Sequence, residues 1–204
     1  MSGDSSTAAF AKKLIAREFG ELFIYPMHYE TIETIWADER NRLLLDEVLA
    51  DPDLPDEARF LAAEVFFRKD ILFMQRHSPA MIAAIYANAL RNDFTGMANS
   101  WGLLYDHQDD GPVGIAFLTI GQKAIPALCG LLDDESTRLQ YQGSVEAAVG
   151  NGYGYRTKDF AAYYIGRILG KPLRFHRDIA ARDQEIERLK RDTGCGFSHS
   201  LSSR

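Results

Sequence analysis

Residues 55–75 read PDEARFLAAEVFFRKDILFMQ and carry apolar side chains in two stripes at helical spacing. The first stripe holds Ala58, Leu61, Ala62, Val65 and Leu72, and the second holds Phe60, Phe67, Ile71 and Met74. Pro55 suits the first turn of such a helix, because its missing N–H would have no partner there. A helix that is apolar on two sides packs between neighbouring elements. We therefore expect a sandwiched helix over the whole stretch.

Helical signals continue on both sides of this stretch. A capping hydroxyl among residues 5–7 begins a first helix that Gly20 ends, and Ser78 followed by Pro79 marks another helix start. Further helices are expected over residues 29–50 with a break at 38–42, and over 112–120, 122–132, 144–149, 156–169 and 175–192. Alternating apolar patterns typical of strands are nearly absent, so the sequence predicts an all-α fold.

Glycine divides the predicted helices into two kinds. No glycine occurs between Glu21 and Thr95, whereas twelve of the sixteen glycines fall between Gly96 and Gly170. The first half therefore predicts long helices, and the second half predicts shorter helices joined by turns. We expect a single all-helical domain over residues 1–193 and a disordered tail over 194–204.

Composition and charge exclude several classes of protein. Of the 204 residues 46% are apolar and 25% are charged, the balance of a globular chain. No uncharged apolar run approaches the roughly 18 residues of a membrane span, so no membrane partner is expected. The net charge of -6 disfavours nucleic acid, whose binding depends on clustered Lys and Arg. Residues 28–64 carry eleven acids and three bases, which indicates either an ordinary solvated surface or an acidic face for a basic partner.

The two cysteines, Cys129 and Cys195, form neither a disulfide framework nor a paired-cysteine metal site. The first ten residues lack a basic region followed by an apolar stretch, so no secretory signal is expected. Together these features predict a cytoplasmic protein.

Two segments of the second half resemble the helices of a HEAT-like (armadillo-type) repeat. Residues 121–134 read GQKAIPALCGLLDD, similar to the first-helix pattern A-[IV]-P-x-L-x-x-L-L-x-D. Residues 156–166 read RTKDFAAYYIG, similar to the second-helix pattern R-x-x-A-A-x-x-[IL]-G. The resemblance covers about residues 121–170 and departs from the family at 135–155, where only a short linker is usual.

The resemblance implies stacked antiparallel helix pairs in an α-α superhelix, here with a glycine- and tyrosine-rich insertion. It also implies a surface for binding other proteins. The HEAT-like bilin lyases, a similar subset, handle a chromophore, but no residue here matches such a site, so no cofactor is expected.

The candidate binding site is centred on residues 140–164, which hold five of the nine tyrosines. Tyr and Arg combine rigid contact area with hydrogen bonding, as at binding hot spots. A second turn-rich stretch lies beside this segment if both emerge at the same end of the helices. The predicted site residues are Tyr141, Tyr153, Tyr155, Arg156, Asp159, Asn99 and Trp101. The alternative is that Tyr163 and Tyr164 pack in the core and that Arg156 and Asp159 form a structural helix-start pair.

Motifs for catalysis or metal binding are weak. Residues 106–111 place Asp and Gly as in a calcium loop, but Phe117 stands where the bidentate Glu belongs. The glycines of 150–154 follow no strand and do not match a dinucleotide fingerprint. Ser144 lacks the setting of a nucleophile elbow, and no His-Glu-x-x-His pattern occurs. We therefore predict no catalytic residue and no metal.

Three functions follow from these patterns. The first is a non-enzymatic, cytoplasmic, helical-repeat-like module that binds another protein through residues 140–164, or through the acidic face of 28–64. The second is a small-molecule binder or cofactor-free enzyme, in which Tyr155 or Asp159 transfers protons and Arg156 holds an anionic substrate. The third is an acidic neutralising partner of a basic protein, of the immunity-protein type.

Overall fold

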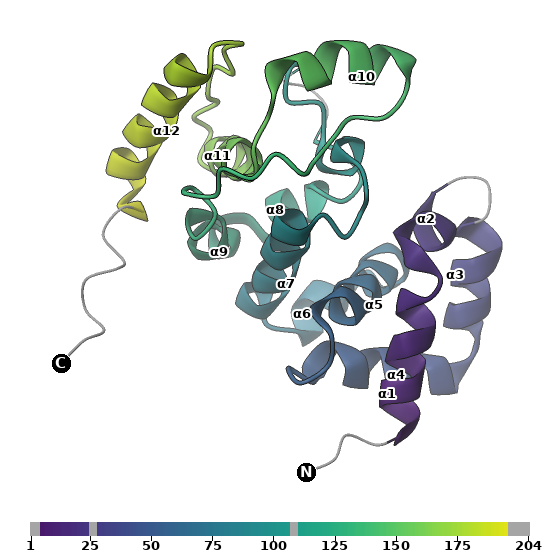
Figure 1. Cartoon of the computed structure of the whole chain (residues 1–204). Helices are drawn as coiled ribbons and strands as arrows, with labels where there is room; N and C mark the ends of the chain where they lie inside the picture. The colour runs from purple at the N-terminus through teal and green to yellow at the C-terminus, as the bar shows by residue number, and fades with distance from the viewer. Residues whose placement is uncertain (1–4, 25–27, 107–109, 196–204) are drawn as a thin grey trace. The chain divides into compact units, whose positions relative to one another are not determined.

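The computed structural model describes residues 5–24, 28–106 and 110–195. Within these ranges the regular elements are helices, with no strand (Figure 1). No helix in the described ranges is long and apolar enough to cross a bilayer. The predicted all-α class is therefore confirmed.

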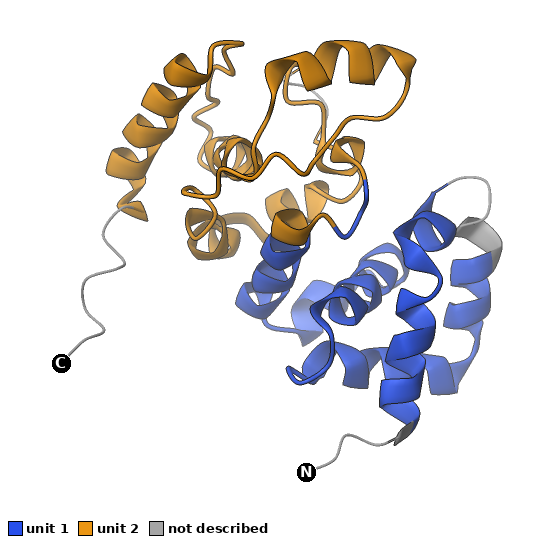
Figure 2. Cartoon of the chain, in the orientation of Figure 1, with its two compact units in different colours: residues 1–89, 94–96 blue, residues 90–93, 97–204 orange. Residues whose placement is uncertain are grey.

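The chain divides into two compact units (Figure 2). Unit 1 comprises residues 1–89 and 94–96, and unit 2 comprises 90–93 and 97–204. The single domain expected over 1–193 stays a prediction.

Two helices of unit 1 begin at residues whose side chains accept backbone N–H groups. Its elements are α1 (Ser5–Ile15), α2 (Glu18–Phe23), α3 (His28–Ala37), α4 (Glu39–Ala50), α5 (Asp56–Lys69), α6 (Phe73–Arg76) and most of α7 (Pro79–Asn92). The expected break in the second helix falls at Asp38, whose side chain accepts the N–H of Arg40 at 2.9 Å. Ser78 accepts the N–H of Met81 at 3.4 Å, and Pro79 is the first residue of α7 as predicted.

Two helix ends differ from the prediction. Gly20 lies inside α2 and does not end a helix. The first helix instead ends earlier, at Ile15, and α2 begins at Glu18. The helix expected over 55–75 ends at Lys69, since Asp70 takes an extended backbone and its side chain accepts the N–H of Leu72 at 2.9 Å. Ile71 and Leu72 are therefore exposed, whereas Phe73 of the following helix is buried.

The core of unit 1 is built around α5, which contacts α1, α3 and α4. The Phe60 ring is fully buried and lies 5.9 Å from that of Phe19 and 5.5 Å from that of Tyr86. The buried Glu64 accepts hydrogen bonds from Tyr86 Oη at 2.6 Å and Arg68 Nε at 2.9 Å. Burial raises the pKa of Glu64, and these two donors oppose that rise. The sandwiched position predicted for this helix is confirmed.

Unit 2 packs its elements around α11. They are the 3-10 turn η1 (Ala98–Trp101), α8 (Ile115–Ile120), the 3-10 turn η2 (Gly121–Ala124), α9 (Ile125–Cys129), α10 (Ser144–Gly150), the 3-10 turn η3 (Asn151–Tyr153), α11 (Thr157–Ile168) and α12 (Ile179–Thr193). The helix expected over 122–132 is divided between η2 and α9. α11 contacts α8, α9 and α12. The two segments of the HEAT-like resemblance thus pack together, while their repetition as stacked pairs stays a prediction.

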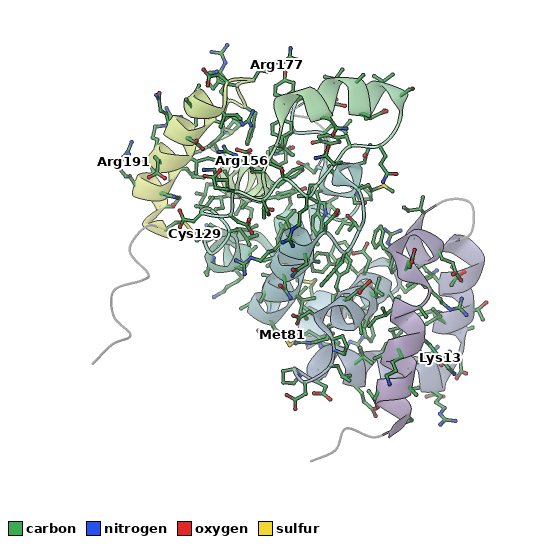
Figure 3. The ribbon with its side chains drawn as sticks, viewed as in Figure 1. Lys13, Met81, Cys129, Arg156, Arg177 and Arg191 are labelled. Atoms are coloured by element: carbon green, nitrogen blue, oxygen red, sulfur yellow. A yellow bond between two sulfur atoms is a disulfide. The ribbon has the colours of Figure 1, made fainter. Side chains whose placement is uncertain are left out.

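A disulfide joins Cys129 of α9 to Cys195, just beyond α12 (Figure 3). Gly194 ends α12 in the left-handed conformation at φ 72°, so the first two residues of the predicted tail belong to the folded unit. Residues 196–204 lie outside the described residues. The bridge corrects the expectation of no disulfide: the cysteines are 66 positions apart, and they meet because α11 contacts both helices.

Candidate functional site

The two turn-rich segments of the predicted site lie side by side in unit 2. The Asn99 side chain accepts the N–H of Gln142 at 2.8 Å and donates to its carbonyl at 3.0 Å. Tyr141 Oη donates to the carbonyl of Gly102 at 2.9 Å and accepts the N–H of Leu104 at 3.2 Å. The predicted neighbourhood of the two segments is therefore confirmed.

The tyrosines of this region form a packed aromatic group. The rings of Tyr153 and Tyr155 stack with centroids 5.1 Å apart, and Tyr141 meets Tyr155 edge to face at 6.3 Å. The Arg182 guanidinium lies 5.0 Å from the Tyr155 ring. Burial raises the pKa of Tyr155, so its hydroxyl stays protonated and is no proton acceptor near neutral pH.

Charged side chains gather at the start of α11, where we define the Arg156 cluster as Arg156, Asp159, Asp183, Glu135 and Lys158 (Figure 3). The Arg156 N–H and Nε donate to Asp159 Oδ2 at 2.8 and 3.1 Å, so the Asp159 side chain caps the start of α11. Arg156 also donates to Asp183 at 2.8 Å and to Glu135 at 2.9 Å. Lys158 pairs with the same two carboxylates. The cluster thus ties α12 and residue 135 to α11.

Burial separates the seven predicted site residues into two groups. Asn99 and Tyr153 are half-buried. The other five are 5% exposed or less: Trp101, Tyr141, Tyr155, Arg156 and Asp159. Side chains this enclosed cannot touch a partner in this structure.

The buried five hold unit 2 together. All three guanidinium nitrogens of Arg156 donate to carboxylates, so none is left for an anionic substrate. The structural alternative, a helix-start pair with Tyr163 and Tyr164 in the core, is the arrangement observed.

Replacing Asp183 with Asn will lower the free energy of unfolding at pH 7. The hydrogen bond from Arg156 lowers the pKa of Asp183 from 3.8 to about 2. Because the folded pKa is the lower one, this stabilisation is present above pH 3.8 and is lost as the pH falls toward 2. The side chain is 40% exposed and screened by solvent, so we expect a loss of about 1 kcal/mol.

Urea unfolding of the Asp183→Asn chain, followed by circular dichroism, checks this. The difference from wild type should be constant between pH 7 and 5 and shrink below pH 4. Asp192→Asn, on the same helix and exposed, is the control and should change little. A difference that persists unchanged at low pH would contradict the assignment.

An open apolar surface lies in unit 1, where a hollow of about 420 Å³ separates α4 from the turn between α5 and α6. Its floor includes Trp36 and Phe66, whose rings meet edge to face at 5.7 Å. Leu43 on one side is 62% exposed, and Ile71, next to Leu72 on the other, is 95% exposed. We call this hollow the unit 1 groove; its lining is Trp36, Glu39, Arg42, Leu43, Asp46, Phe66, Asp70, Leu72 and Arg76.

The sequence does not predict this groove, because the single helix expected through residue 75 would bury Ile71 and Leu72. The available signal was Asp70, a residue type that forms turns by accepting backbone N–H groups two positions on. Five lining residues fall in the acidic stretch of 28–64: Trp36, Glu39, Arg42, Leu43 and Asp46.

The charge of the chain is divided unequally between the two units. Unit 1 contains 15 acidic and nine basic residues, whereas unit 2 contains 14 of each. The whole net charge of -6 therefore belongs to the unit that carries the groove.

Metal-ligating side chains do not converge in the part of the chain that the structure describes: no three His, Cys, Asp or Glu residues there are placed to hold an ion. Part of the calcium-like loop, residues 107–109, lies outside the described residues. No family model, curated protein or solved structure matches this chain.

Proposed function

We propose that this protein is a non-enzymatic, helical-repeat-like interaction module that binds another protein through the unit 1 groove. The observation that carries the proposal is the exposure of Leu43, Ile71 and Leu72 around a hollow floored by Trp36. Contiguous exposed apolar side chains with a charged rim are typical of protein interaction sites. Five of the nine lining residues belong to the acidic stretch of 28–64, which the sequence offers as a second candidate surface.

A protein partner fits this surface better than a small molecule does. Ile71 does not line the hollow, although it is the most exposed of these apolar residues. A small ligand inside the hollow would leave Ile71 in water, whereas a partner surface can cover both. The enzyme alternative has less support, because Tyr155, Arg156 and Asp159 are buried, and Arg156 and Asp159 are hydrogen-bonded to each other.

The repeat architecture over 121–170 is part of the same proposal. It is supported by the packing of α9 against α11, the two helices that the HEAT-like resemblance pairs. In this proposal unit 2 is a scaffold that its own ion pairs and its disulfide stabilise, and unit 1 contacts the partner protein.

Affinity capture from the source cells tests the proposed function. We expect wild type to retain a partner that the Leu43→Glu, Leu72→Glu variant loses, because two carboxylates in an apolar contact are costly to desolvate. The matched control is Val145→Glu, Val149→Glu, which changes two exposed apolar residues of α10 in unit 2. Capture that survives the groove variant, or that only the α10 variant abolishes, would reject the assignment. Circular dichroism of both variants monitors folding.

A further inference from the structure

The wall that α4 gives to the unit 1 groove has a regular pattern. Glu39, Leu43 and Asp46 stand at positions i, i+4 and i+7, so they share one face of the helix. An exposed apolar residue is thus flanked along α4 by two carboxylates, all three of them exposed.

These two carboxylates are not compensated. Glu39 makes no ion pair with any described residue. Asp46 lies 3.2 Å from His77 Nε2, but without hydrogen-bond geometry. Burial lowers the pKa of His77 below 6.5, so the imidazole is neutral near pH 7 and does not neutralise the charge of Asp46.

The arginines of the groove are already engaged. Arg42 donates to the carbonyl of Trp36 at 2.7 Å and lies 5.8 Å from its ring centroid. Arg76 pairs with Asp70 and lies 5.8 Å from the ring of Phe66. Asp70 neutralises Arg76, whereas Arg42 keeps its charge because no described ion pair includes it. Together with Arg42, the carboxylates of Glu39 and Asp46 still leave the lining with a net negative charge.

We infer that the groove takes an amphipathic helix of a partner protein, with aliphatic anchors facing Leu43 and Leu72 and Lys or Arg facing Glu39 and Asp46. The inference rests on the function proposed above and specifies the partner. The described part of unit 1 has no strand edge for β-addition, whereas helical walls suit a helix in a groove. The charge of unit 1 steers a basic partner toward this face.

Three synthetic peptides of about 18 residues serve as probes. The first has Leu at i, i+3, i+4 and i+7 with Lys beside that face. The second has the same Leu positions with Glu in place of Lys, and the third has the composition of the first in scrambled order. Fluorescence anisotropy of each labelled peptide measures its affinity for the full chain at low and at physiological salt.

We expect the Leu/Lys peptide to bind best and the Leu/Glu peptide to bind at least about tenfold more weakly. Glu39→Gln with Asp46→Asn should weaken the Leu/Lys peptide about three- to tenfold and flatten its salt dependence, since two exposed ion pairs are lost. Glu146→Gln with Asp192→Asn removes the same charge from unit 2 and should leave binding unchanged.

Tryptophan emission reports where the peptide binds. The chain has two tryptophans: Trp36 on the groove floor and Trp101, fully buried in unit 2. Binding in the groove should change the emission of wild type and leave that of Trp36→Phe unchanged.

Several results would overturn the inference. Equal binding of the Leu/Glu or scrambled peptide would reject the stated chemistry, and equal weakening by the unit 2 control would reject the location. If no peptide binds while capture from cells still depends on Leu43, the partner class is wrong and the proposed function stands. If neither peptide binding nor capture from cells depends on Leu43, the inference and the proposed function are both wrong. A sedimentation coefficient that rises with protein concentration in wild type but not in Leu43→Glu would assign the groove to a second copy of the chain instead.

Discussion

Replacing Asp159 with Ala will lower the free energy of unfolding by about 3–5 kcal/mol, the cost of breaking a buried ion pair. Asp159 is fully buried and accepts hydrogen bonds from the N–H, Nε and Nη2 groups of Arg156. It also lies 3.4 Å from Arg182 Nε. Its removal leaves two buried guanidinium groups short of a counter-charge and removes the cap of α11.

Urea unfolding followed through Trp101, the tryptophan of unit 2, measures this loss. Asp159→Asn keeps an acceptor for the cap but loses the charge, so it should fall between wild type and Asp159→Ala. Asp192→Ala on α12 is exposed and should change stability by less than about 0.5 kcal/mol. An Asp159→Ala loss as small as this control would show that the Arg156 cluster contributes nothing to folding.

Replacing both cysteines with Ser will cost about 4 kcal/mol in unfolding free energy under oxidising conditions. Cys129 and Cys195 are 66 positions apart, and a bridge across that separation removes much conformational freedom from the unfolded chain. Thermal unfolding with and without dithiothreitol measures the effect. Reductant should bring wild type to the stability of the double variant and leave the variant unchanged.

An unreduced wild type no more stable than the double variant would show that the bridge is absent or makes no contribution. Alkylation and mass spectrometry of protein taken from its source cells count the free thiols directly. Disulfides persist in oxidising compartments, so a fully bridged population in the cell would count against the predicted cytoplasmic location.

Helix starts could be predicted because they depend on neighbouring residues. The Ser78–Pro79 pair acts within three positions along the chain, and the structure begins α7 there. For α4 the sequence predicted only a break within 38–42, which the structure places at Asp38. Helix ends depend less on the neighbouring residues alone. The end of α5 at Lys69 depends on a turn at Asp70 that competes with a continuing apolar stripe.

The candidate site shows the same limit. Residue type and segment position correctly predicted that Asn99 lies beside the tyrosine-rich segment. They could not show which side chains are buried, since that depends on distant partners: Arg156 is satisfied by Glu135 and Asp183, 21 and 27 positions away. The unit 1 groove is lined by residues of four helices and a turn, and no single stretch of sequence contains it.

The covalent link between α9 and the end of α12 also determines how proteolysis appears on a gel. A protease that cuts once between residues 130 and 194 produces two fragments that stay joined through sulfur. Electrophoresis without reductant would then report the mass of an uncut chain, and only the reduced lane would reveal the cleavage.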